Sequence, residues 1–208
     1  MKHRKKYLKL GIFFFLGFVL FSFLTKFGFF DKIDFNLTVK IQNHIPKAID
    51  GIFSFFSIIG GVEVPFFVIA LILLLRKKLK GIAVIFLFLA GHLIEFLGKT
   101  YFYHPGPPFA FFRYDFPILF PRSYIQAASS YPSGHSLRAV FLALIFMFLL
   151  GVSKKVGLKK KIIAKCIILG LMMIMLVSRI SLGEHWFSDV VGGSLLGLSF
   201  GFISLIFL

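Results

Sequence analysis

Three residues near the C-terminal end of the chain, Arg179, His185 and Asp189, have types and spacing that could form a charged catalytic site. His185 follows Arg179 by six residues and Asp189 follows His185 by four, between two long apolar segments. If a helix begins near His185, the imidazole and the Asp189 carboxylate share one helical face, so the carboxylate could orient the ring. An arginine alongside would offer a planar fork of donors for phosphate or carboxylate oxygens. The pattern predicts an oriented histidine beside an anion-binding group.

A second group of candidates, Ser133, Gly134 and His135, lies in the stretch Tyr131-Pro132-Ser133-Gly134-His135-Ser136, just before another apolar segment. A Pro-Ser-Gly turn entering a helix leaves backbone N–H groups unpaired at the positive end of the helix dipole, and such an end binds phosphate. His135 would sit in the first turn, where it could donate or accept a proton. Lys99, at the end of a third apolar segment, adds a further cation.

The composition shows which elements must position these groups. Of the 208 residues, 58% are hydrophobic, 31 are Phe and only 15% are charged. A soluble domain of this length could not bury so much apolar surface, so we expect an integral membrane protein. The single cysteine, Cys166, excludes a disulfide within the chain and a cysteine-based metal site.

The net charge of +16 is concentrated in places that favour a membrane protein over a nucleic-acid-binding one. Of the 24 Lys and Arg residues, 15 fall in runs at 1–9, 76–80 and 154–165, which separate apolar segments and contain no acidic residue. This is the pattern of cytoplasmic loops under the positive-inside rule. We therefore expect the lipid bilayer, and not nucleic acid, as a partner.

Hydropathy predicts an all-α bundle of six transmembrane helices that uses residues 1–208 as a single domain. The expected spans are about 10–30, 53–75, 81–98, 135–152, 162–178 and 187–208. Gly60-Gly61 and Pro65 indicate a break before or within the second span, preceded by a short helix on the membrane surface. An even number of spans puts both termini on the same side of the membrane, and the basic runs indicate that this side is cytoplasmic. Lys99, His135 and His185 then share the outer face of a cell membrane.

Two sequence patterns carry a resemblance to a known family. Ser178-Arg179, five residues, His185, three residues and Asp189 resemble the third signature of the type 2 phosphatidic acid phosphatase superfamily. Pro132-Ser133-Gly134-His135 resembles the second signature. The family's first signature is Lys, six residues, Arg-Pro; here Lys99 and Pro107 are in place, but Gly106 stands at the arginine position.

The resemblance implies a membrane phosphatase that needs no metal or other cofactor. His185 would be the nucleophile, Asp189 would orient it, and His135 would protonate the leaving oxygen and then activate water. The phosphate oxygens would be held by four further positions: Lys99, Arg179, Ser133 and Gly134. Phosphoryl transfer depends mostly on positioning and charge stabilisation, which such donors supply.

Gly106 removes one phosphate contact that the family pattern contains. Arg138 lies three residues after His135, on the same helical face and near the outer end of its span. An arginine at that depth needs a partner or a polar cavity. Our hypothesis is that Arg138 reaches the phosphate in place of the missing arginine, with Arg113 and Arg122 as weaker candidates.

Several other polar residues have plainer interpretations. His92 and Glu95 face one side of the third span and could form an internal polar pair. His104 lies in the gap of the first signature and could touch substrate. The aromatic and proline-rich segment 101–132 is either an interfacial belt or a lid over the site.

The favoured substrate is a lipid phosphate or diphosphate at the outer face. Undecaprenyl diphosphate is preferred, and phosphatidate, phosphatidylglycerol phosphate and lipid A remain open. One alternative is a non-catalytic lipid-binding or scaffolding relative that lost turnover through Gly106. Another is an enzyme acting on a soluble phosphate ester or in a vanadate-dependent oxidation, since soluble acid phosphatases and vanadium haloperoxidases carry similar motifs.

Overall fold

The computed structural model describes residues 2–76, 79–113 and 129–208, and every regular element in these ranges is helical. The all-α prediction is confirmed. Short 3-10 turns occupy Lys47–Ile49, Leu79–Gly81 and Phe109–Phe111. The α-helices of the described ranges are α1 (Lys2–Lys26), α2 (Asp31–His44), α3 (Asp50–Ile59), α4 (Glu63–Arg76), α5 (Ile82–Tyr101), α6 (Gly134–Val152), α7 (Leu158–Ser181) and α8 (Phe187–Ser204).

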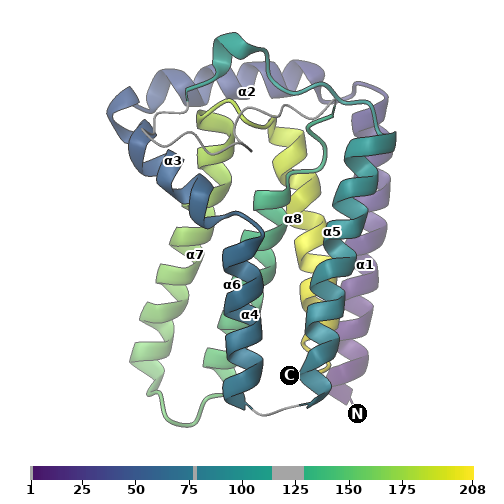
Figure 1. The fold of residues 1–208 in the computed structure, drawn as a ribbon, viewed down its shortest axis with the longest axis vertical. Coiled ribbons are helices and arrows are strands. Elements are labelled where there is room, and N and C mark those ends of the chain that lie inside the picture. Colours follow the sequence, from purple (N-terminus) through teal and green to yellow (C-terminus); the bar gives the residue numbers. More distant parts are fainter. Residues whose placement is uncertain (1, 77–78, 114–128) are drawn as a thin grey trace.

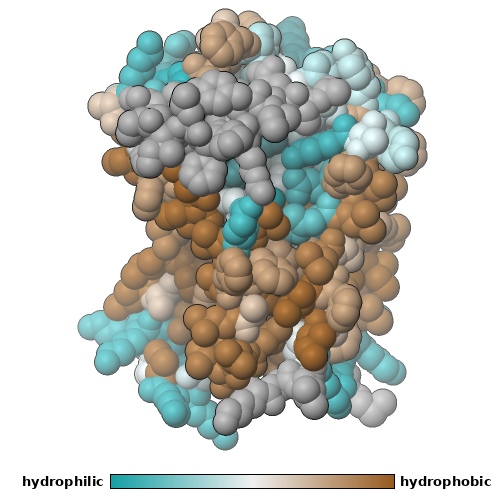
Figure 2. All heavy atoms as spheres, in the orientation of Figure 1, coloured by the Kyte–Doolittle hydropathy of each residue, from teal (hydrophilic) through white to brown (hydrophobic). Residues whose placement is uncertain are grey.

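The helices form a membrane-spanning bundle with a covered end. Within the described ranges, α1, α5, α6, α7 and α8 are each long and apolar enough to cross a bilayer, and α3 and α4 together form a bent sixth candidate. In Figure 1, α2 lies across the end of the bundle opposite to both chain termini. In the view of Figure 2, hydrophobic side chains cover the middle of the molecule and many hydrophilic ones gather toward its ends. The protein is therefore a multi-pass membrane protein.

The expected second span, 53–75, is not one continuous helix. α3 ends at Ile59, Gly60 caps it, and α4 begins only at Glu63, with a 53° bend between the two helical segments. Pro65 lies in the first turn of α4, where a missing backbone N–H costs nothing. The break therefore falls at the two glycines, and it turns the C-terminal end of α3 toward the neighbouring helices.

The surface helix α2 presents its polar side to the protein. Asp34 and Thr38 are buried, whereas Ile33 and Phe35 are 42% and 51% exposed. The Asp34 carboxylate accepts hydrogen bonds from the backbone N–H of Ser188, at 2.8 Å, and from its hydroxyl, at 2.6 Å. An acidic group there satisfies open donors at the start of α8. This contact fixes α2 over the beginning of α8.

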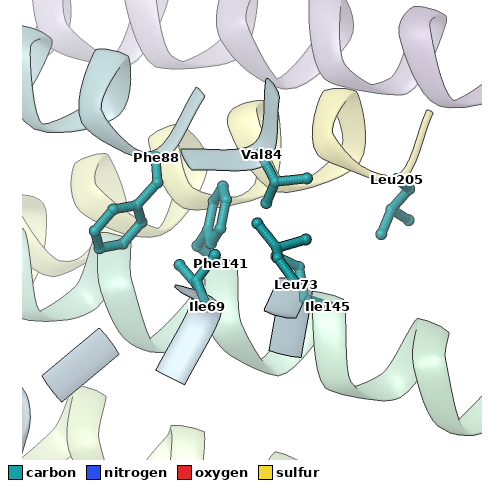
Figure 3. Packing of buried hydrophobic residues seen from close by; sticks show 7 residues of the cluster. All are labelled: Ile69, Leu73, Val84, Phe88, Phe141, Ile145 and Leu205. Atoms are coloured by element: carbon teal, nitrogen blue, oxygen red, sulfur yellow. The ribbon is translucent and has the colours of Figure 1, made fainter. Parts of the chain in front are cut away.

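α8 lies at the centre of the bundle, where it packs against α1, α6 and α5. Small residues allow this close approach, because a methyl group at Gly193 would overlap the Ser133 carbonyl of α6's N-cap, and one at Gly197 would lie 2.5 Å from the Leu137 carbonyl oxygen. The apolar cluster in Figure 3 fills the space between α4, α5, α6 and the C-terminal end of the chain. Its members are Ile69, Leu73, Val84, Phe88, Phe141, Ile145 and Leu205. This packing brings the beginnings of α6 and α8 and the ends of α5 and α7 to the end of the bundle beneath α2.

Candidate active site

The turn between α7 and α8 carries His185 and brings it to Asp189. Gly183 makes the turn possible, since its φ of +70° is a conformation that L side chains rarely adopt. α8 begins at Phe187, so His185 precedes the N-cap and Asp189 reaches back toward it, with Oδ2 lying 3.4 Å from His185 Nδ1. Asp189 Oδ2 also accepts the Trp186 backbone N–H at 2.8 Å. Because Nδ1 faces the carboxylate, Nε2 is the nitrogen left for chemistry.

A second imidazole, that of His104, lies against the other oxygen of Asp189. His104 Nδ1 is 3.1 Å from Asp189 Oδ1, and both side chains are buried. Burial alone would lower the pKa of His104, but the carboxylates of Asp189, Asp34 and Asp31 outweigh it and hold that pKa above its ordinary value. The sequence placed His104 only within reach of a substrate and gave no sign of this contact.

The start of α6 provides the second group of predicted residues. Ser133 is the N-cap, and its Oγ accepts the Ser136 backbone N–H at 3.4 Å. The Ser133 backbone N–H donates to the Asp189 carbonyl oxygen at 3.0 Å, which joins the two sequence motifs directly. His135 lies in the first turn, with Nε2 3.0 Å from the Ser57 carbonyl oxygen of α3. The two histidines expected to act together therefore belong to neighbouring, hydrogen-bonded segments.

Arg179 is completely buried near the end of α7 and is paired with a carboxylate of its own chain. Its Nη1 donates to Glu184 Oε2 and to the Ser57 hydroxyl, both at 2.6 Å, and Nη2 donates to the Phe53 carbonyl oxygen at 3.2 Å. The Ser57 hydroxyl also donates to Glu184 Oε1 at 3.1 Å. Glu184 thus occupies donors that the family pattern assigns to phosphate.

A second internal carboxylate, Glu95, lies among the remaining predicted phosphate ligands. Lys99 Nζ is 2.7 Å from Glu95 Oε1, and Arg138 Nη1 is 3.6 Å from Glu95 Oε2. A methyl group at Gly134 would overlap this carboxylate, so Glu95 also touches the first residue of α6. His92 Nε2 lies 4.0 Å from Glu95, close to the expected polar pair. Lys99, Arg138 and the beginning of α6 therefore converge on one anion.

Arg138 connects this cluster to the break in the second span. Its Nε donates to the Gly60 carbonyl oxygen at 2.6 Å, and its Nη1 lies 3.3 Å from His92 Nε2. The side chain is only 7% exposed, although it sits one turn into a membrane helix. Its partners satisfy the expectation that an arginine at this depth is paired.

The other arginine candidates are placed differently. Arg113 forms an ion pair with Asp50, at 2.9 Å and 3.0 Å, and donates to the carbonyl oxygens of Gln42 and Ile45. It therefore ties the segment after the 3-10 turn Phe109–Phe111 to α3 and the C-terminal end of α2. Arg122 and the rest of 114–128, nearly half of the expected lid or belt, lie outside the described residues. In the ranges that are described, no three His, Cys, Asp or Glu side chains are arranged to hold a metal ion.

Ser57 and Glu184 are site residues that sequence reasoning missed. Ser57 contacts His135 through its carbonyl oxygen and Arg179 through its hydroxyl. A serine within an apolar helix, and an acid directly before the expected nucleophile, were the available signals. Neither signal identifies the contacting residue, because the contacts of Ser57 join residues 78 or more positions apart and the contact between Glu184 and Arg179 crosses a turn whose shape the sequence does not give.

The fold and motifs agree with comparisons to known proteins. A solved PAP2-type phosphatidylglycerolphosphate phosphatase from Bacillus subtilis is similar in fold, with a TM-score of 0.75 and 20% identity over 94% of each chain. Aquifex aeolicus LpxE has a TM-score of 0.61 and 25% identity over 83% of this chain and 94% of its own. A search of curated proteins finds no match. The PAP2 superfamily model matches residues 80–208, which include all three motif regions, and the chain belongs to this superfamily.

Proposed function

We propose that this protein hydrolyses a membrane lipid phosphate or diphosphate through a covalent phosphohistidine on His185. One observation carries the proposal: the cationic donors around the two histidines, among them Arg179 and Lys99, are each held by an internal carboxylate, Glu184 or Glu95. A group of cationic donors that already accommodates two carboxylates suits a phosphate, which presents the same kind of oxygen acceptors.

In the proposed first step, His185 Nε2 attacks phosphorus and the bond from phosphorus to the leaving oxygen breaks. Asp189 holds Nδ1–H and stabilises the positive charge that develops on the ring. At 3.4 Å the two atoms are farther apart than in a well-formed hydrogen bond, and catalytic contacts commonly shorten when substrate binds. His135 donates a proton to the leaving oxygen, which departs as an alcohol or as a lipid monophosphate.

In the second step, His135 accepts a proton from water as the water oxygen attacks the phosphohistidine. The N–P bond breaks, His185 regains its free Nε2 and inorganic phosphate leaves. The transferring group is stabilised by Arg179, Lys99, Ser133 and the Gly134 backbone N–H. Arg138 takes the place of the arginine that the family pattern has at position 106. The reaction uses no metal or other cofactor, as the resemblance implies.

The proposed orientation follows from charge. Both chain termini and the run 154–165 lie at the end of the bundle opposite α2 (Figure 1). Under the positive-inside rule that end would face the cytoplasm, and His185 is therefore proposed to face the outer side of a cell membrane. The exposed Ile33 and Phe35 of α2 would rest in the membrane surface. The whole chain, 1–208, is proposed to act as one domain.

Undecaprenyl diphosphate is the proposed substrate, supported by the compact six-span plan and the outward site. Phosphatidylglycerol phosphate, phosphatidate and lipid A are the comparison substrates. The alternative function, lipid binding without turnover, is favoured by the one specific departure from the family pattern, Gly106.

Phosphate release from these four lipids by purified protein in detergent, with chelator present, tests the proposal. We expect release from one lipid, complete loss in His185→Ala, and a labelled phosphoenzyme that is acid-labile and missing from His185→Ala. His135→Ala should retain the label longer than wild type, because water is no longer activated. Undiminished release by His185→Ala would refute the mechanism, and lipid binding without any release would support the binding relative.

A further inference from the structure

We infer that His104 is a positioning residue of this site, which shares the Asp189 carboxylate with His185 and so sets the charge that Asp189 presents to the nucleophile. The inference deepens the proposed function and rests on it. None of the three sequence motifs includes His104 as a functional position.

The geometry is that of one carboxylate between two imidazoles. Asp189 Oδ1 lies 3.1 Å from His104 Nδ1, and Asp189 Oδ2 lies 3.4 Å from His185 Nδ1. Asp189 is completely buried, and His104 and His185 are 7% and 8% exposed. With water excluded on both sides, each imidazole experiences the carboxylate without much solvent screening.

The position of His104 is fixed by its own backbone and by the next residue. Its N–H donates to Ser129 Oγ at 3.3 Å, and its carbonyl oxygen accepts from the Ser130 N–H at 2.9 Å and hydroxyl at 3.2 Å. The Trp186 indole N–H donates to the Pro105 carbonyl oxygen at 2.9 Å. The segment is thus held on one side by 129–130 and on the other by the residue that follows His185.

The charges around His104 favour its protonated form. Asp189 faces it from α8, and Asp34 and Asp31 face it from α2. Together they overcome the effect of burial and hold the pKa of His104 above its ordinary value. A protonated His104 keeps Asp189 ionised and at the same time offsets part of its charge. His185 then faces a carboxylate whose negative charge is partly balanced from its other side.

A purely structural role makes a different prediction. If His104 only anchored the segment before Pro105, its replacement would lower stability or scale the rate, and the titration of His185 would stay where it was. If His104 supplies charge, its removal lets Asp189 act on His185 alone. The pKa of His185 must then rise.

The test is His104→Gln, whose amide can still donate to Asp189 but carries no charge. The protein has six histidines, so isotope-labelled His185 can be titrated by NMR in detergent, beside the acid limb of the kcat/KM profile. We expect both to move upward by about one pH unit, as for the loss of a charge within several ångströms at a shielded site. Ser129→Ala, which loosens the backbone anchor and keeps the imidazole, should move neither.

His104→Asn is a second neutral variant in case the glutamine variant does not fold. An unmoved His185 titration in a folded neutral variant would overturn the inference, as would an equal shift in Ser129→Ala. The NMR titration requires no turnover. A shift without phosphate release by any variant would therefore refute the proposed function and leave the coupling of His104 to His185 standing.

Discussion

Replacing Arg138 with glutamine tests most directly how this chain works without an arginine at position 106. Arg138 shares Glu95 with Lys99, which places its guanidinium at the proposed phosphate site. Losing one preorganised charged donor to a transferring group typically costs about 3–4 kcal/mol of transition-state stabilisation, or about 10²- to 10³-fold in rate. We expect a fall of that size in kcat/KM for Arg138→Gln.

The cost to the fold should be smaller than the cost to catalysis. Arg138→Gln removes the 2.6 Å hydrogen bond to the Gly60 carbonyl oxygen, a loss of about 1–3 kcal/mol for a buried acceptor left unpaired. Glu95 keeps Lys99 at 2.7 Å, so the substitution does not leave a buried carboxylate without a cation. The variant should therefore insert and fold, with a modestly lower melting temperature.

The assay compares lipid phosphate release and thermal unfolding in detergent for matched variants. Arg113→Gln is the control, because it removes a partly buried arginine whose guanidinium pairs with Asp50 and two carbonyl oxygens, and not with Glu95 or Glu184. It should lower stability with little effect on kcat/KM. Gly106→Arg in the Arg138→Gln background should restore part of the activity, since it returns an arginine to the position that the family pattern gives it and a Cβ there would make only ordinary contact with Ser130. Near-normal turnover in Arg138→Gln would refute the reasoning.

Three further predictions follow from particular contacts. Glu184→Gln should tighten binding of inorganic phosphate about fivefold, because a neutral amide holds Arg179 less strongly than the Glu184 carboxylate does. Weaker phosphate binding in calorimetry would contradict the idea that Glu184 and phosphate compete for Arg179. Because folding raises the pKa of His104, protonated His104 stabilises the fold fully at pH values below 6.5, its ordinary pKa. That stabilisation is lost as pH rises through the higher pKa of the folded state. The melting temperatures of wild type and His104→Gln should therefore converge at alkaline pH. Gly193→Ala should lower the free energy of unfolding, measured by chemical denaturation, by about 1–3 kcal/mol, because the added methyl group overpacks the contact between α6 and α8. Gly170→Ala is the control, since a methyl group there meets open space and should have no such effect. Equal effects of the two substitutions would argue against close packing of α6 and α8.

The sequence was sufficient for the class of fold and for the convergence of the motifs. Hydropathy and the basic runs predicted a helical membrane protein, and spacing alone brought His185 near Asp189. What it could not supply was the contact between distant helices. Nothing local indicates that Ser57 touches His135, or that Asp34 holds the start of α8. Those pairings depend on how the chain bends at Gly60 and how α2 lies over the bundle.

Burial explains why one of the two internal carboxylates, Glu184, is paired with an arginine of the same chain. Arg179 is completely buried, and an arginine without a counter-ion in such a place costs several kcal/mol. Glu184 meets that need and is itself held by Ser57, whose carbonyl oxygen lies against His135. In the proposed mechanism an incoming phosphate exchanges with this carboxylate, and the exchange releases Ser57 together with Glu184. Because the same serine touches the arginine and the proposed proton donor, we expect binding of a phosphate head group to be coupled to a rearrangement around Ser57 in α3.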